Sequence, residues 1–205
     1  MTVIVDYGVG NLFSLKSSFA AIGEEAMISS DKEEIAGADR IILPGVGAFS
    51  DAALKLKESG LDQTVINAAK NGVPLLGICL GMQLLFEKDY EYGEHDGLGL
   101  IKGNVTAIDD LGRLKIPQIG WNALEFVGSH PLFKYIKNGD HVYFVHSYAA
   151  TDCEESVIAK TEYGKMLTAA VAYKNVLGCQ FHPEKSGEVG LNILRAFAEM
   201  KKERV

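Results

Sequence analysis

Cysteine is scarce in this sequence of 205 residues, and no two cysteines are close enough to form a C-x-x-C pair. Cys79, Cys153 and Cys179 form an odd set, so neither a disulfide framework nor a zinc knuckle is expected. Such sparse cysteine favours a reducing compartment. Long apolar runs are also missing, because none approaches the roughly 20 residues of a membrane span. The first residues have no basic segment and no cleavage-site pattern, so we expect a cytoplasmic protein without a membrane partner.

Positive charge is not in excess either. The chain has 20 Lys and Arg against 27 Asp and Glu, a net charge of −7, and no long basic run. This balance argues against nucleic acid as a partner, because a polyanion would be repelled. Hydrophobic residues make up 47% of the chain and charged residues 23%, which supports a sizeable core and disfavours disorder. The length suits a single domain spanning residues 1–205.

Short apolar runs alternate with amphipathic stretches over much of the chain. Strands are expected at Val3–Asp6, Arg40–Leu43, Pro74–Ile78 and Val176–Phe181, and helices at Leu12–Ile22, Phe49–Lys70 with a break at Gly60, Met82–Phe86 and Val189–Met200. This alternation predicts an α/β fold with a mostly parallel open sheet and helices on both faces. From about Leu98 to Tyr173 strand-like segments follow one another, the clearest being Val142–Tyr148. That region predicts antiparallel additions at the sheet edge or a flap.

The segment from Gly77 to Gly81 has the form G-x-C-x-G, with Cys79 where an apolar strand gives way to a helix. This is the cysteine version of a nucleophile elbow, in which flanking glycines allow a sharp turn. The following helix N-terminus would favour a thiolate, and the amide of Leu80 would be free to stabilise an oxyanion. An isolated cysteine is more often a buried structural residue, so the turn alone leaves both interpretations open.

A catalytic thiol needs a base, and the base needs an orienting group. His182 ends an apolar strand, as the strand before Cys79 also ends, and carboxyl ends of strands meet at one edge of an open sheet. Glu184 follows two residues later, on the same face of extended backbone. Pro183 and Glu184 could instead simply end the strand and cap the next helix. With the elbow present, a Cys79–His182–Glu184 triad is the favoured interpretation.

Other candidate sites are weaker. His146 is a rival base, but a histidine in mid-strand is more often a satisfied core residue. His141 and His146 have no cysteine or acid at metal-ligand spacing, so no metal is expected. Gly8 and Gly10 lack the third glycine of a dinucleotide fingerprint, with Phe13 in its place, so we expect no nucleotide cofactor.

Two motifs closely resemble those of the class I, or triad, glutamine amidotransferases: GICLGMQLLF at 77–86 and QFHPEKS at 180–186. Their fold is a flavodoxin-like α/β sheet. Four further motifs are similar to the glutaminase subunits of imidazole glycerol phosphate synthases: DYGVGN at 6–11, PGVGAF at 44–49, GWN at 120–122 and YFVHSY at 143–148. The resemblance covers nearly the whole chain. PGVG discriminates most, because anthranilate and GMP synthase glutaminases carry PGG-type loops.

The resemblance implies a role for each matching residue. Cys79 would attack the side-chain amide of glutamine, His182 would transfer protons, and Glu184 would orient His182. The oxyanion hole and substrate site would comprise Val46, Gly47, Leu80, Gln83, Glu91, Ser147 and Tyr148. The hole is expected to be incomplete until a partner is bound, and our hypothesis makes the Val46–Gly47 peptide the switch, held off through Val9 or Gly10 of the neighbouring loop.

The resemblance also implies a heterodimer with a (β/α)8-barrel cyclase. Ammonia would reach it through a channel, and the cyclase would make imidazole glycerol phosphate and aminoimidazole-carboxamide ribonucleotide (AICAR) in histidine biosynthesis. Trp121, Asn122 and Tyr143–His146 are candidates for the docking surface, although Trp121 could equally be a core residue. Three alternatives remain open: a glutaminase for anthranilate, aminodeoxychorismate or pyridoxal phosphate synthesis, a stand-alone cysteine hydrolase such as a γ-glutamyl peptidase, and a non-catalytic assembly subunit.

Overall fold

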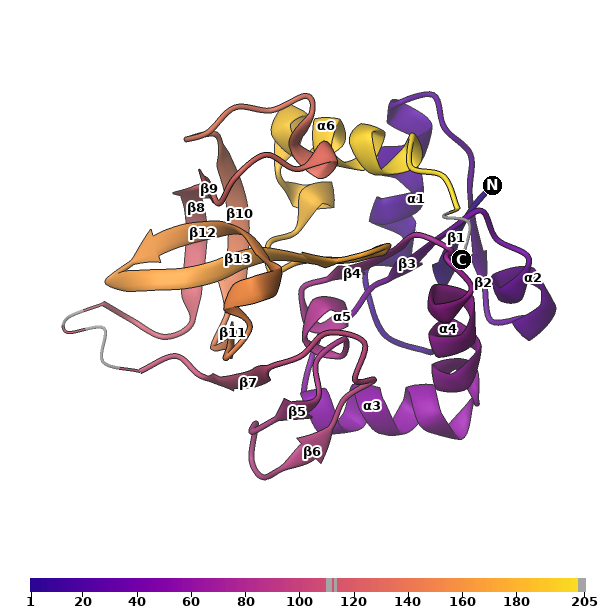
Figure 1. The fold of residues 1–205 in the computed structure, drawn as a ribbon, viewed down its shortest axis with the longest axis horizontal. Helices are drawn as coiled ribbons and strands as arrows, with labels where there is room; N and C mark the ends of the chain where they lie inside the picture. The colour runs from indigo at the N-terminus through magenta and orange to yellow at the C-terminus, as the bar shows by residue number, and fades with distance from the viewer. Residues whose placement is uncertain (110–111, 113, 203–205) are drawn as a thin grey trace.

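The computed structural model, which describes residues 1–109, 112 and 114–202, is built on an eight-stranded sheet (Figure 1). Five parallel strands come in the order β2 (Ala26–Ser29), β1 (Thr2–Val5), β3 (Arg40–Leu43), β4 (Leu75–Ile78) and β14 (Val176–Cys179). Three antiparallel strands extend this sheet beyond β14, namely β13 (Lys165–Tyr173), β12 (Val157–Tyr163) and β9 (Glu125–Phe126). The predicted open α/β sheet with antiparallel edge additions is therefore confirmed.

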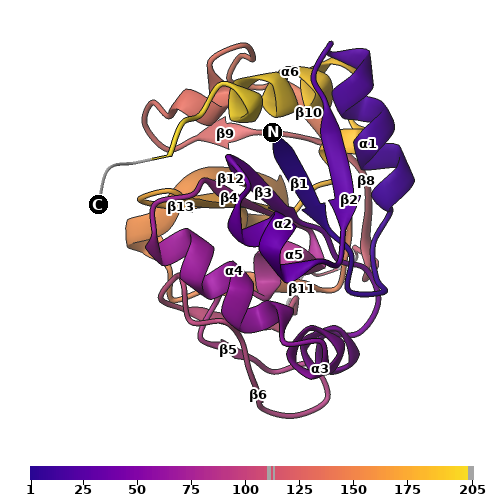
Figure 2. The ribbon, with the colours of Figure 1, turned by 90° about the vertical axis from the view of Figure 1, so that its right-hand side faces the viewer.

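Helices cover both faces of the sheet, as Figures 1 and 2 show. One face carries α1 (Leu12–Ala21) and α6 (Gly187–Ala198), and the other carries α2 (Lys32–Ala36), α3 (Phe49–Glu58), α4 (Leu61–Lys70) and α5 (Leu80–Gln83). Strand side chains alternate between the two faces. In β1, Val3 and Val5 join the cluster under α3 and α4, whereas Ile4 joins the cluster under α1 and α6. Burial on both faces explains why these strands are apolar throughout.

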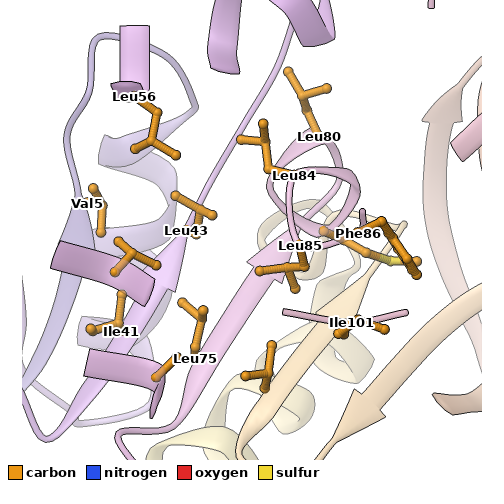
Figure 3. Packing of buried hydrophobic residues seen from close by; sticks show 14 of the residues in the cluster. Val5, Ile41, Leu43, Leu56, Leu75, Leu80, Leu84, Leu85, Phe86 and Ile101 are labelled. Carbon is orange, nitrogen blue, oxygen red and sulfur yellow. The ribbon is translucent and has the colours of Figure 1, made fainter. Parts of the chain in front are cut away.

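The turn after β4 is anchored in the core. Figure 3 shows Leu80, Leu84 and Leu85 in one cluster with strand residues Leu43 and Leu75. All five are buried. Fully burying a leucine side chain contributes about 1.5–3 kcal/mol, so this cluster holds the start of α5 firmly against the sheet.

Two smaller sheets are made by the middle of the chain. One pairs β8 (Gln118–Ala123) with β10 (His141–His146), and the other has the order β11 (Tyr148–Thr151), β7 (Asn104–Ala107), β5 (Lys88–Asp89) and β6 (His95–Asp96). Three 3-10 turns complete the description: η1 (Pro131–Phe133), η2 (Glu154–Ser156) and η3 (Pro183–Lys185). The strand expected at Val142–Tyr148 is divided at Ser147, which lies between the two small sheets.

Two expectations about helices have different outcomes. The break at Gly60 is confirmed, since Gly60 adopts a φ of +70° between α3 and α4. The helix expected through Met82–Phe86 is shorter, because α5 ends at Gln83. The carbonyls of Leu84 and Leu85 accept hydrogen bonds from the amides of Leu98 and Leu100 instead of continuing a helix. Within the described ranges, no helix has the length and apolar character needed to cross a membrane.

Candidate active site

Cys79 lies at the sharp turn between β4 and α5. Its backbone has φ +54° and ψ −113°, a left-handed conformation that a residue with a Cβ rarely adopts. Such a residue costs roughly 1–3 kcal/mol, so the surrounding structure must enforce it. The first amide of the following helix, that of Leu80, belongs to the N–H groups that a helix leaves without an internal acceptor. The geometry is that of the predicted nucleophile elbow.

Three glycines make this turn possible by close packing of backbone. A Cβ on Gly77 would lie 2.5 Å from the carbonyl oxygen of Gly81, and a Cβ on Gly81 would lie 1.9 Å from the carbonyl oxygen of Leu43. A Cβ on Gly45 would lie 2.7 Å from the amide nitrogen of Gly81. The glycines around Cys79 are therefore required by contact between β3, β4 and α5.

His182 follows β14 and is fixed through its backbone. Its amide donates to the carbonyl of Tyr143 at 2.9 Å, and its carbonyl accepts from the Ser186 hydroxyl at 2.6 Å. The same hydroxyl accepts from the amide of Tyr143 at 3.0 Å. Strand β10 and the turn η3 are thus joined at the histidine, which sets the direction of its ring.

The imidazole and the predicted third member of the triad are in direct contact. Nδ1 of His182 lies 2.8 Å from Oε1 of Glu184, and the two side chains are only 3% and 2% exposed. Burial lowers the pKa of His182, but hydrogen bonding to Cys79 and to Glu184 outweighs burial and raises this pKa to about 9. A raised pKa favours the imidazolium form of His182, which is the form that can donate a proton.

One cavity of about 320 Å³ contains both Cys79 and His182 in its lining. All predicted oxyanion and substrate-binding residues line the same cavity: Val46, Gly47, Leu80, Gln83, Glu91, Ser147 and Tyr148. They come from segments that are far apart in sequence and meet at the carboxyl ends of β3, β4 and β14. Glu184 stands behind His182 rather than in the lining. The roles of these residues stay predictions, but their convergence is a structural finding.

Glu91 is engaged at one end of this cavity. Its Oε2 accepts a hydrogen bond of 2.5 Å from the amide of Phe49, at the start of α3. Its own amide donates to Oδ1 of Asp89 at 2.7 Å. The carboxylate is thereby held close to the loop that contains Val46 and Gly47.

That loop is tied to the segment after β1. The Tyr7 hydroxyl donates to the carbonyl of Pro44 at 2.6 Å, and a Cβ on Gly10 would lie 2.9 Å from Cβ of Pro44. Val46 is 40% exposed, and Gly47 has a φ of +92°. The contact between the two loops is therefore made through Pro44, whereas the predicted control of the Val46–Gly47 peptide remains a hypothesis.

His146, the rival base, is a satisfied buried residue. Its Nδ1 lies 2.7 Å from the carbonyl of Tyr148, and its Nε2 lies 2.9 Å from Oε1 of Gln118. Burial lowers the pKa of His146 to about 4. With both nitrogens occupied, it has no free position from which to deprotonate a thiol.

Sequence analysis missed Gln180, a fully buried residue that contacts the nucleophile. Its Nε2 lies 3.7 Å from Sγ of Cys79, and its Oε1 accepts a hydrogen bond of 3.1 Å from Nε2 of Gln83. Nε2 of Gln83 also donates to the carbonyl of Tyr148 at 3.2 Å. The sequence signal that could have identified Gln180 is its position as a polar residue in the otherwise apolar run from Val176 to Phe181. Ser186 was missed as well, because its contacts depend on tertiary structure.

Two further predictions concern surfaces and metals. Trp121 is 52% exposed and lies edge-on to Tyr143, with 6.1 Å between ring centroids, so it is not a core residue. Residues 1–109, 112 and 114–202 contain no group of three or more His, Cys, Asp or Glu side chains that could hold a metal ion.

Comparison with known proteins identifies the family. Residues 3–200 match the family described as glutamine amidotransferase class-I. The imidazole glycerol phosphate synthase subunit HisH of Lactococcus lactis is 51% identical over 198 residues, which cover 96% of this chain and 97% of the relative. The protein of the same name from Aquifex aeolicus is 48% identical, with coverage of 96% and 95%.

Solved structures share the fold at lower sequence identity. The structure of PurLQS from Thermotoga maritima aligns with a TM-score of 0.75 at 21% identity and covers 96% of each chain. A structure described as a glutamine amidotransferase aligns with a TM-score of 0.74 at 23% identity, covering 96% of this chain and 98% of its own. With the sequence matches, these findings show that the chain belongs to the class-I glutamine amidotransferases and, within them, to the HisH subunits of imidazole glycerol phosphate synthases.

Proposed function

We propose that this protein hydrolyses L-glutamine to glutamate and ammonia and delivers the ammonia to a cyclase subunit. The convergence of Cys79 and His182 at one cavity, with Glu184 in contact with the imidazole behind it, in a member of this family, is the observation that supports the proposal best.

In the first half of the reaction, Sγ of Cys79 attacks Cδ of the glutamine side chain. A C–S bond forms, and the carbonyl oxygen becomes an oxyanion. When the tetrahedral intermediate collapses, the C–N bond breaks and the imidazolium of His182 gives its proton to the departing nitrogen. The products are ammonia and a γ-glutamyl thioester on Cys79. Glu184 keeps the histidine in the required orientation through the 2.8 Å contact.

In the second half, water attacks the thioester carbonyl while neutral His182 accepts a proton from it. Collapse of this intermediate breaks the C–S bond and returns the Cys79 thiolate and the His182 imidazolium. Glutamate leaves the cavity. The γ-carboxyl group of the product loses its proton to solvent, so the net reaction is glutamine and water to glutamate, a proton and ammonia, with the enzyme unchanged.

The oxyanion is proposed to be held by the amide of Leu80 and by the Val46–Gly47 peptide. Backbone amides aimed at a developing charge commonly supply a large part of catalysis. Gln83 uses both N–H groups of its side chain on Tyr148 and Gln180, so its Oε1 is left as an acceptor for a substrate N–H. Glu91, Ser147 and Tyr148 are proposed to hold the amino and carboxylate groups of glutamine.

The acceptor of ammonia is proposed to be a (β/α)8-barrel cyclase that forms a heterodimer with this chain. The relatives are named as subunits of imidazole glycerol phosphate synthase. A subunit that produces ammonia needs an acceptor close by, because free ammonia diffuses away and its protonated form is not nucleophilic. The half-exposed Trp121 and its neighbour Tyr143 are the proposed docking residues. We propose that residues 1–205 act as one glutaminase domain in the cytoplasm.

The test is ammonia release from glutamine by this chain alone and together with the cyclase and its nucleotide substrate. We expect co-purification of the two chains and a large rise in ammonia release on assembly. Cys79→Ala should abolish release, and Cys153→Ala, which alters another buried cysteine, should not. Full activity without a partner would favour a stand-alone hydrolase, and stimulation only by a different synthase would identify a different pathway.

A further inference from the structure

Among the described residues, Gln180 has the only side-chain amide that contacts the sulfur of Cys79. It directly follows β14, is fully buried, and lies with its Nε2 atom 3.7 Å from Sγ. The thiol of Cys79 itself can donate only weakly, to the carbonyl of Val145 with 4.0 Å between sulfur and oxygen. The amide of Gln180 is therefore placed to donate to a thiolate at this position, in addition to the imidazole of His182.

The direction of the Gln180 amide is fixed by its neighbours. The carbonyl of Tyr148 can only accept, so the nitrogen of the Gln83 amide must face it at 3.2 Å. The same nitrogen donates at 3.1 Å to the side chain of Gln180, which must present its oxygen there. The nitrogen of Gln180 is thereby left to face Sγ of Cys79. The carbonyl of Tyr148 thus fixes the orientation of the Gln83 amide, and the Gln83 amide fixes the orientation of the Gln180 amide that faces Cys79.

We propose that Gln180 is a positioning residue that donates a hydrogen bond to Sγ of Cys79, orients it and favours the thiolate, with Gln83 and the carbonyl of Tyr148 fixing the direction of the donor. Its importance for glutamine hydrolysis rests on the proposed function. Its effect on the sulfur does not, because ionisation of the thiol can be measured without glutamine. Donation to an ionised acceptor is stronger than donation to a neutral one, so this contact stabilises the thiolate over the thiol.

A purely structural role makes a different prediction. If Gln180 only fills space and satisfies Gln83, its replacement would change stability without changing the reactivity of Cys79. The pH dependence of alkylation separates the two roles, because iodoacetamide reacts with the thiolate. The chain has three free cysteines, so the reaction is followed separately on the peptide that contains Cys79 by mass spectrometry.

The experiment compares wild type with Gln180→Met, Gln180→Asn and the control Gln63→Met. Methionine keeps the length without a donor, whereas asparagine keeps the amide but withdraws it from the sulfur. The control alters an exposed glutamine whose amide contacts only its neighbour Asp62. Circular dichroism and thermal unfolding establish which variants are folded, and the asparagine variant provides the test if the methionine variant is not.

We expect both Gln180 variants to move the pH midpoint of Cys79 alkylation upward by about one pH unit, with no movement in the control. With the cyclase present, kcat should fall by about tenfold while KM changes less, because the lost interaction acts on the nucleophile. An unchanged midpoint in a folded Gln180 variant would overturn the inference. If wild type released no ammonia with the cyclase, the proposed function would fail, and the alkylation midpoint would still decide the role of Gln180.

Discussion

Nδ1 of His182 lies 2.8 Å from one carboxylate oxygen of Glu184, and the other oxygen, Oε2, is buried without a hydrogen-bond partner in the described structure. The carboxylate is therefore directed at the imidazole and shares its charge with no other donor. This arrangement fixes the ring and leaves its Nε2 for the sulfur of Cys79. Much of the chemistry proposed for this cavity depends on that pairing.

Glu184→Gln should preserve the shape of the pair and remove its charge. We expect kcat/KM of the assembled enzyme to fall by at least about tenfold. The carboxylate helps to raise the pKa of His182 to about 9, so its loss should lower that pKa. The alkaline limb of the pH–rate profile, where the imidazolium loses its proton, should therefore move to lower pH. A profile with an unmoved alkaline limb would show that Glu184 does not act on His182.

Gly81→Ala should disrupt the nucleophile turn, because the added Cβ would lie 1.9 Å from the carbonyl oxygen of Leu43. We expect a loss of about 3 kcal/mol in the free energy of unfolding, measured by urea denaturation. Gly37→Ala is the matched control, since its Cβ would lie 3.3 Å from the carbonyl oxygen of Glu33 and φ is −86°. The control should change stability by less than about 1 kcal/mol. Equal effects would contradict the tight packing described for the elbow.

Asp89 should make the protein less stable as pH rises from 4 to about 6. Burial raises its pKa from the usual 3.8 to about 6; the hydrogen bond from the amide of Glu91 opposes this rise, the charge of Glu91 adds to it, and His95 opposes it. Because the pKa of Asp89 is higher in the folded protein than in the unfolded chain, its contribution to the free energy of unfolding is fully present below pH 3.8. This contribution is lost as the pH rises to about 6.

Asp89→Asn cannot ionise and keeps an oxygen for the amide of Glu91. Relative to wild type, the variant should gain about 1–2 kcal/mol in unfolding free energy between pH 4 and pH 6.5, after allowance for solvent screening. Denaturation curves of both proteins across this pH range provide the measurement. A difference that stays constant with pH would mean that Asp89 ionises as easily in the folded chain as in the unfolded chain.

Val46→Gly should raise ammonia release in the absence of the cyclase. A Cβ penalises the backbone conformations needed to turn the Val46–Gly47 peptide, and removing it relieves about 0.5–1 kcal/mol, or roughly two- to fivefold in rate. Val127→Gly serves as control, because Val127 is also exposed but does not line the cavity. No gain over wild type, or the same gain in the control, would count against the peptide as a switch.

The main sheet and the nucleophile turn could be predicted because their signals are local. Apolar β-branched runs identified β1, β3, β4 and β14, and the glycines around Cys79 identified the turn. Strand β2 and helix α2 were not predicted. The first is a partly buried edge strand and the second has only five residues, so neither shows a strong hydrophobic pattern.

Long-range pairing limited the rest of the prediction. The end of α5 at Gln83 depends on amides from Leu98 and Leu100, which no local pattern near residue 83 indicates. The exposure of Trp121 depends on the pairing of β8 with β10. Gln180 gains its importance only when β14 lies beside β4 and brings the amide to the sulfur. Motifs revealed the reacting groups, whereas tertiary contacts revealed what supports them.

The most direct test is to capture the covalent intermediate on the nucleophile. The chain, the cyclase and its nucleotide would be mixed with L-glutamine, quenched rapidly in acid, digested and analysed by mass spectrometry. We predict a γ-glutamyl group on the peptide containing Cys79, and none on the corresponding peptide of Cys79→Ala. Ammonia release that continues in Cys79→Ala, or that proceeds while the γ-glutamyl group is found on another residue, would contradict the mechanism.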